Sequence, residues 1–204
     1  MIEQLLLFLS VSALLTLSPG PDILYVVTQS VSNGSRSGIA TALGLVSGIP
    51  VHTTFIAFGM AAVIRDHPSL FTFIKILGAL YLLYLAWMTY RADARIRLSD
   101  SGIDKADYWK LYQRGLMMNL INPKVIIFFL AFFPGFLWDP LDGVRTQFYV
   151  LGFVFLLQAL AIFVLASLFS AALSVPLREN DHLAVVLKWI QVFVFIGIAV
   201  YIVI

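Results

Sequence analysis

The sequence predicts an all-α integral membrane protein with six transmembrane helices, and three observations support this class. Hydrophobic residues make up 61% of the 204 residues and charged residues only 12%, against about 25% charged residues in ordinary soluble domains. Six apolar runs approach the roughly 20 residues that cross a bilayer. Short polar segments separate most of these runs, so no stretch is left for a separate soluble domain.

The predicted spans follow one another along the chain with recognisable breaks. The first covers residues 5–31, and it is expected to be retained because Glu3 stands where a signal peptide carries positive charge. The others cover 39–64, 70–90, 116–133, 148–173 and 183–204. Turn-forming loops at 32–38, 65–68, 139–143 and 177–182 separate them, together with a longer polar connection at 91–114.

The distribution of lysine and arginine predicts the orientation in the membrane. The loops after spans one, three and five hold Arg36, Arg91, Arg95, Arg97, Lys105, Lys110, Arg114 and Arg178. The opposite side holds Arg65 and Arg145, with Lys75 a short way into span three. Since cytoplasmic loops are enriched in these residues, the odd-numbered loops are expected in the cytoplasm and both termini outside.

An internal repeat is visible in the order of three weak matches. Residues 43–45 resemble 151–153, residues 70–75 resemble 183–188, and a Pro-Asp step in span one matches a Pro-Lys step in span four. We expect one transmembrane domain over 1–204, with repeat one at about 1–90, a cytoplasmic linker at about 91–114 and repeat two at about 115–204. Two units of three spans would lie inverted in the membrane, a recurring design of secondary transporters.

The first polar motif breaks span one near its middle. It comprises Ser18, Pro19, Gly20, Pro21 and Asp22. Prolines lack an N–H, so the carbonyls of Leu15 and Leu17 lose their helical donors at a depth where irregular backbone must be buried in protein or line a cavity. The half-helix that begins near Pro21 offers a positive end to an anionic group, while Asp22 can accept its N–H groups or bind a cation. The alternative is a kink that only helps packing.

The second motif repeats this pattern in span four. It comprises Asn119, Asn122, Pro123 and Lys124. Pro123 frees the carbonyl of Asn119, which the two asparagine amides could satisfy. Lys124 either reaches the membrane interface with its long side chain or forms a midplane pair with Asp22, which would lower the cost of both charges. Charged groups at this depth indicate a polar pathway, and the substrate is expected at these two motifs.

Three further residues are candidates for the cavity or for a proton relay. They are Gly48, His52 and Gln158. His52 follows Gly48 and Pro50, and an imidazole can titrate in the physiological range, although a hydrogen bond to a neighbour is the alternative. Gln158 could instead bond across helices, and the spacing of Gly44 and Gly48 permits close helix approach.

Several classes of protein are not expected. The chain has no cysteine, and its three histidines are scattered without a metal-binding spacing. It has neither a phosphate-binding loop nor a credible catalytic constellation, so we expect neither an enzyme nor a cofactor or metal. A net charge of +2 without a basic face gives no indication of a nucleic-acid partner. From the residues alone, the prediction is a secondary transporter of a small polar solute.

These motifs resemble the LysE/RhtB family of bacterial amino-acid exporters. The resemblance covers nearly the whole chain and rests on residues 18–22, Gly34, Gly38, Gly44, Gly48, residues 75–85 and residues 115–124. It implies export of amino acids or close derivatives across the bacterial inner membrane, with proton antiport as the expected coupling. Oligomeric state stays open, with a homodimer as one alternative. The competing functions are export of a metal cation or other small metabolite, and a non-transporting membrane subunit.

Overall fold

The computed structural model describes residues 1–18, 20–91, 107–139, 142–170 and 181–203, and every regular element within them is helical. The elements are α1 (Ile2–Leu17), α2 (Pro21–Asn33), α3 (Ser35–Ser47), α4 (Ile49–Asp66), α5 (Pro68–Arg91), α6 (Tyr108–Ile121), α7 (Pro123–Ile127), the π-helical turn η1 (Phe128–Phe132), the 3₁₀ turn η2 (Phe133–Phe136), α8 (Val144–Leu168) and α10 (Asp181–Val203). Pro19 and the parts of the predicted loops at 92–106, 140–141 and 171–180 lie outside the described residues.

The lengths and composition of these helices confirm the multi-pass, all-α membrane class. Four helical segments are long and apolar enough to cross a bilayer: Ser35–Ile64, Ser69–Arg91, Val144–Leu168 and Val185–Val203. Two more spans result if each of two bent pairs is counted as one. The first pair, α1 and α2, is bent by 58°, and the second, Tyr108–Ile121 with Pro123–Phe136, is bent by 49°.

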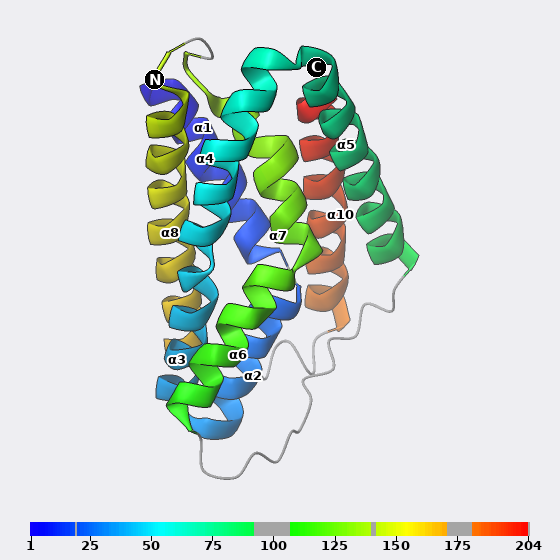
Figure 1. Ribbon diagram of the computed structural model, residues 1–204. Coiled ribbons are helices and arrows are strands. Elements are labelled where there is room, and N and C mark those ends of the chain that lie inside the picture. Colours follow the sequence, from blue (N-terminus) through cyan, green and yellow to red (C-terminus); the bar gives the residue numbers. More distant parts are fainter. Residues whose placement is uncertain (19, 92–106, 140–141, 171–180, 204) are drawn as a thin grey trace.

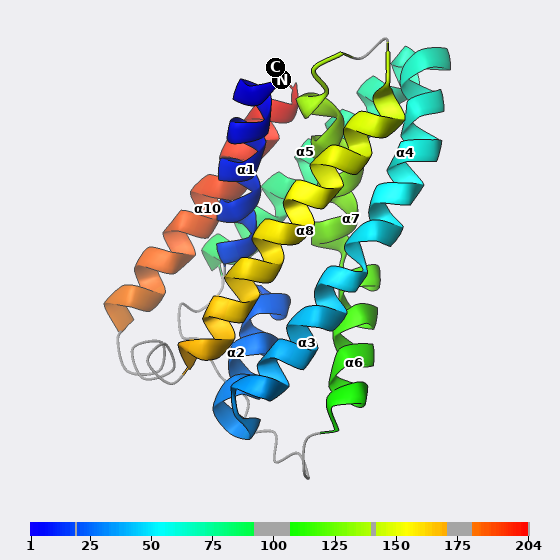
Figure 2. The same ribbon diagram turned by 90° about the vertical axis from the view of Figure 1, so that its left-hand side faces the viewer.

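The two bent pairs run side by side with their breaks at a similar height in the bundle (Figure 1). Both termini lie at the same end of the bundle in both views, and the turn between α2 and α3 lies at the opposite end (Figures 1 and 2). Helices α5 and α10 pack along each other, while α8 contacts α4, α3 and α1. Each half of the chain therefore contributes one bent pair to the middle of the molecule.

Glycines permit the close crossing of α3 and α6. A Cβ atom on Gly44 would clash with the backbone carbonyl of Tyr112, and one on Gly115 would clash with the carbonyl of Thr41. The two helices therefore meet backbone to backbone, which only small residues allow. The close approach predicted from Gly44 and Gly48 is present, and its partner is the first half of the fourth span.

A cluster of buried phenylalanines fills the bundle between the two breaks and the end that holds the termini. The rings of Phe129 and Phe133 stack at 4.1 Å, and Phe8 of α1 meets Phe133 edge-on at 5.0 Å. Phe128, Phe132 and Phe136 are also 1% exposed or less. This close-packed aromatic layer separates the breaks from that end of the molecule.

The fourth span begins earlier than the sequence suggested. Helix α6 starts at Tyr108, within the segment expected to be a polar linker, instead of near residue 116. Asp107 caps it, accepting hydrogen bonds from Trp109 N at 3.0 Å and Lys110 N at 3.3 Å. A capped first turn satisfies otherwise unpaired N–H groups, so the helix continues beyond the apolar run from which the span was predicted.

Candidate functional site

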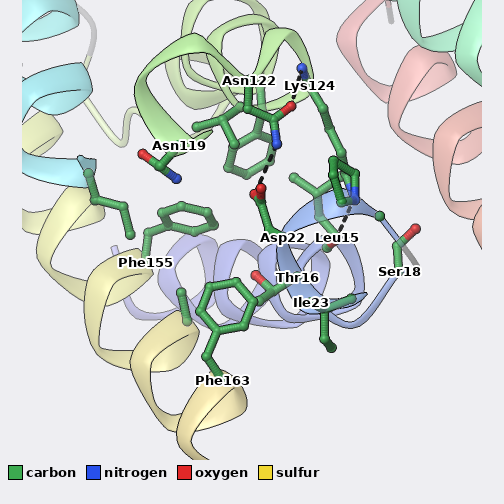
Figure 3. A pocket seen from close by; sticks show the side chains of 16 residues that line it. Leu15, Thr16, Ser18, Asp22, Ile23, Asn119, Asn122, Lys124, Phe155 and Phe163 are labelled. Atoms are coloured by element: carbon green, nitrogen blue, oxygen red, sulfur yellow. Dashed lines mark hydrogen bonds between the residues drawn. The ribbon is translucent and has the colours of Figure 1, made fainter. Parts of the chain in front are cut away.

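The two breaks meet at one small internal cavity of about 40 Å³ (Figure 3). Its polar lining comes from both motifs: Ser18, Gly20, Pro21 and Asp22 from the first, and Asn119, Asn122 and Lys124 from the second. Thr16 and a set of apolar residues complete it. Residues about one hundred positions apart in the chain thus share one cavity, which has room for roughly three water molecules.

The first break leaves a helix end open. Helix α1 ends at Leu17, and α2 begins at Pro21 after Gly20, whose backbone is extended (φ −155°, ψ 174°). No side chain caps the N-terminus of α2. Since Gly20, Pro21, Asp22 and Ile23 all line the cavity, the positive end of a 13-residue helix faces it.

At the second break, the N-terminus of α7 is capped by a side chain of the same motif. Helix α6 ends at Ile121, and the side chain of Asn122 accepts a hydrogen bond from Lys124 N at 3.0 Å, capping α7. Pro123 is the first residue of α7, where its missing N–H costs nothing, and it does not line the cavity. The amide oxygen of Asn122 is thereby occupied within its own segment, while its amide nitrogen stays free to bond elsewhere.

Asn122 connects the two motifs. Its Nδ2 donates to Asp22 Oδ2 at 2.9 Å (Figure 3). The other carboxylate oxygen, Asp22 Oδ1, is buried and has no hydrogen-bond partner. A buried acceptor without a donor is costly, so this oxygen is the clearest unused binding capacity in the cavity.

Lys124 crosses the cavity to the first break. Its Nζ donates to the carbonyl oxygen of Leu15 at 3.0 Å and lies 5.4 Å from the centre of the Phe195 ring. The carbonyl predicted to lose its helical donor is thus bonded by the lysine of the other motif. The side chain points inward and does not reach for the membrane interface. Within the described residues, no carboxylate lies within 4.0 Å of Nζ, so Asp22 and Lys124 share the cavity without direct contact.

His52 of α4 and Gly48, the residue before α4, both contact the second break. The Nε2 atom of His52 lies 3.2 Å from the carbonyl oxygen of Asn119. This oxygen receives no hydrogen bond from Pro123, because proline has no N–H. The backbone N–H of Asn122 also reaches this oxygen at 3.2 Å. The predicted role of the asparagine side chains in satisfying it is therefore taken by His52 and the backbone. Gly48 packs on the side chain of Asn119, and neither Gly48 nor His52 lines the cavity.

Gln158 supports the first break from α8. Its Nε2 donates to Thr16 Oγ1 at 3.0 Å, and Thr16 in turn donates to Ser12 O at 2.9 Å. Thr16 lines the cavity, whereas Gln158 does not. Gln158 therefore lies behind Thr16, outside the cavity lining, and its hydrogen bond joins α8 to α1.

Sequence reasoning missed the apolar wall of the cavity. Phe155, Ala159 and Phe163 line it from α8, opposite Lys124 in Figure 3, where the two rings are labelled. Their spacing of four residues places them on one face of the helix. That spacing is a signal in the sequence, but such stripes line most helix contacts, so it does not by itself separate a cavity wall from ordinary packing.

The sequence is similar to a family of translocators and to named efflux proteins. A family model described as LysE type translocator matches residues 13–204. Two relatives, from Salmonella typhimurium strain LT2 and Salmonella typhi, are each named homoserine/homoserine lactone efflux protein. Each is 32% identical over 145 residues, covering 71% of this chain and 69% of the relative. No solved structure matches the chain at a significant level.

Proposed function

Because the chain belongs to the LysE-type translocator family and is a membrane exporter of amino acids, we propose that it moves them by proton antiport through the cavity at its two helix breaks. Proteins of this family are transporters and not enzymes. The family and the named relatives favour this function over a metal-cation exporter and over a non-transporting subunit. The observation that carries the proposed site is the joint placement of Asp22 and Lys124 in one cavity.

The cavity offers complementary groups to a zwitterion. Asp22 Oδ1 has no partner and can accept from an ammonium group. Lys124 Nζ uses one N–H on Leu15 O, which leaves two for a carboxylate, and the open N-terminus of α2 favours the same negative charge. Asn119 turns its amide nitrogen toward this space in Figure 3. The substrate site we propose comprises the cavity-lining residues of the two motifs: Ser18, Gly20, Pro21, Asp22, Asn119, Asn122 and Lys124. Pro123 is not part of this lining, Pro19 lies outside the described residues, and a substrate role for either stays a prediction from the sequence.

Competition at Asp22 supplies the coupling in this proposal. Either the substrate ammonium or a proton neutralises the carboxylate, so binding of one releases the other, as antiport requires. Gly48, His52 and Gln158 position the two breaks. A proton relay through His52 remains a prediction, and His52→Gln tests it because glutamine can still donate to Asn119 O but cannot titrate.

We extend the proposal to the architecture and the orientation. Two inverted repeats, at about 1–90 and 115–204 with the linker between them, account for bends of 58° and 49° at matching places in the two halves. The prolines of each motif account for the breaks. The orientation proposed is multi-pass in the bacterial inner membrane with the odd-numbered loops in the cytoplasm, which requires both termini at one end, as in Figure 1.

Reconstitution into liposomes tests the proposed function. Purified protein is expected to exchange labelled amino acids across the bilayer, and an imposed pH gradient should accelerate net movement against the proton flow. A gradient of membrane potential alone, at equal pH, is the control for the coupling ion. If the protein exchanges none of the twenty amino acids, the transport function is contradicted. If the rate of transport does not change with the pH gradient, proton antiport is contradicted, while the transport function stands.

A further inference from the structure

We propose that the apolar face of α8 in the cavity, formed by Phe155, Ala159 and Phe163, is the side-chain subsite of the exporter, and that Ala159 sets the size of the side chain it accepts. This inference rests on the proposed function. It goes beyond it by assigning a substrate class: amino acids with an uncharged side chain of small to medium size.

The lining of the cavity is divided by polarity. Asn122 and Lys124 contribute polar groups on one side of Asp22, while the two phenylalanine rings approach from α8 on the other (Figure 3). Phe128 and Ile49 extend the apolar side, and they are 1% and 2% exposed. A zwitterion held by Asp22 and Lys124 would therefore direct its side chain toward α8.

The charge inventory of the cavity excludes charged side chains. Asp22 and Lys124 are the charged groups among the described residues that line it. Both are used by the ammonium and carboxylate common to all amino acids. A lysine or glutamate side chain would then bury a charge against phenylalanine rings without a partner, which is strongly unfavourable.

Ala159 lies between two phenylalanines on the face of α8 that lines the cavity. Residues four apart on a helix lie about 6 Å apart along its axis, so Phe155 and Phe163 stand above and below the position of Ala159. Ala159 is 1% exposed and has the smallest side chain of the three. A larger residue there would fill the space that the substrate side chain needs, while a smaller residue at Phe163 would enlarge it.

The experiment compares alanine, leucine, lysine and glutamate in counterflow with reconstituted protein. Wild type is expected to exchange alanine and leucine at least about tenfold faster than lysine or glutamate. Ala159→Leu should lower leucine exchange relative to alanine exchange by about tenfold. Ala161→Leu is the matched control, since Ala161 lies on the exposed side of the same helix, and it should leave the ratio unchanged.

A second variant keeps the test decisive if Ala159→Leu does not fold. Phe163→Leu removes ring volume and should shift the leucine-to-alanine ratio in the opposite direction, by about threefold to tenfold. The subsite is wrong if both substrates fall equally in these variants, if the ratio does not move, or if wild type exchanges lysine or glutamate as fast as alanine. Absence of any exchange by wild type would instead contradict the proposed function.

Discussion

The two helix breaks use similar residues but are built differently. At the first break the N-terminus of α2 carries no side-chain cap and faces the cavity. At the second, Asn122 caps α7 from within the motif, and His52 reaches the carbonyl of Asn119 from α4. One helix end is left open, and the other is closed by Asn122 of its own motif together with His52 of α4.

This difference indicates a division of roles. Unpaired polar groups at membrane depth are costly, so a break that stays open has capacity for a ligand, whereas a closed break serves as a support. Two side chains of the closed break form hydrogen bonds to the open one: Asn122 donates to Asp22, and Lys124 donates to the carbonyl oxygen of Leu15. We therefore expect substitutions at the first break to affect transport most and those at the second to affect both stability and transport.

The largest effect is expected from Asp22→Asn at the open break. This change removes the negative charge that attracts the substrate ammonium and leaves Lys124 without a counter-charge in the cavity, and an uncompensated buried charge is costly. Amino-acid exchange in liposomes should fall by about a hundredfold or more. Glu3→Gln, on the exposed first turn of α1, is the control and should leave exchange unchanged. An Asp22→Asn protein that keeps half of its exchange would remove the distinction between the breaks.

Lys124→Met should have the next largest effect. It removes a hydrogen-bond donor for the substrate carboxylate, but the open N-terminus of α2 remains. Exchange should therefore fall by about thirtyfold, less than for Asp22→Asn. The double variant Asp22→Asn/Lys124→Met should have a higher Tm in detergent than either single variant, because removing both charges leaves none unpaired. Lys75→Met, beside Phe71 on α5, is the control. A double variant no more stable than the singles would show that the two charges do not depend on each other.

Asn122 allows the cap of the closed break to be separated from its link to Asp22. Asn122→Ala loses both and should cost about 1 kcal/mol of stability, together with about tenfold in exchange from the lost bond to Asp22. Asn122→Ser keeps a good capping residue, so its Tm should recover while its exchange stays low. Ser18→Ala is the matched change at the open break, where Ser18 Oγ has no partner, and it should hardly alter Tm. Equal recovery of Tm and exchange in Asn122→Ser would mean that the cap alone matters.

The smallest effects are expected from alanine at Gly20, within the first break, and at Gly48, which packs on Asn119 of the second break. A Cβ on Gly20 would lie 3.5 Å from Lys124 Nζ, an ordinary contact, and its backbone suits any residue, so exchange should change by less than about twofold. A Cβ on Gly48 would lie 2.9 Å from Cγ of Asn119 and displace that side chain, which should lower exchange by about fivefold. Liposome counterflow at matched protein levels measures both. The reverse order would indicate that the open break is the more tightly packed of the two.

Much of the fold followed from the sequence because a membrane restricts the choices. Within the described residues, the six apolar runs fall on the four helices of spanning length and on the two bent pairs, and the bends fall at the two polar motifs. The start of α6 was missed because Asp107 extends the helix into polar sequence. Within the site, the free carbonyl of Leu15 was expected from the prolines, but its partner was not, because Lys124 lies more than one hundred residues away.

The sequence by itself determined that this chain crosses a membrane, where its helices break, and that an acid and a base occur at those breaks. The physical reason is local: the length of an apolar run and the cost of a charge in lipid depend on residues that are neighbours in the sequence. The tertiary structure decided which groups meet. Helix rotation and crossing placed Asn122 on Asp22, His52 on Asn119 and the phenylalanine face of α8 against the cavity, and these contacts depend on packing among distant segments that no local pattern specifies.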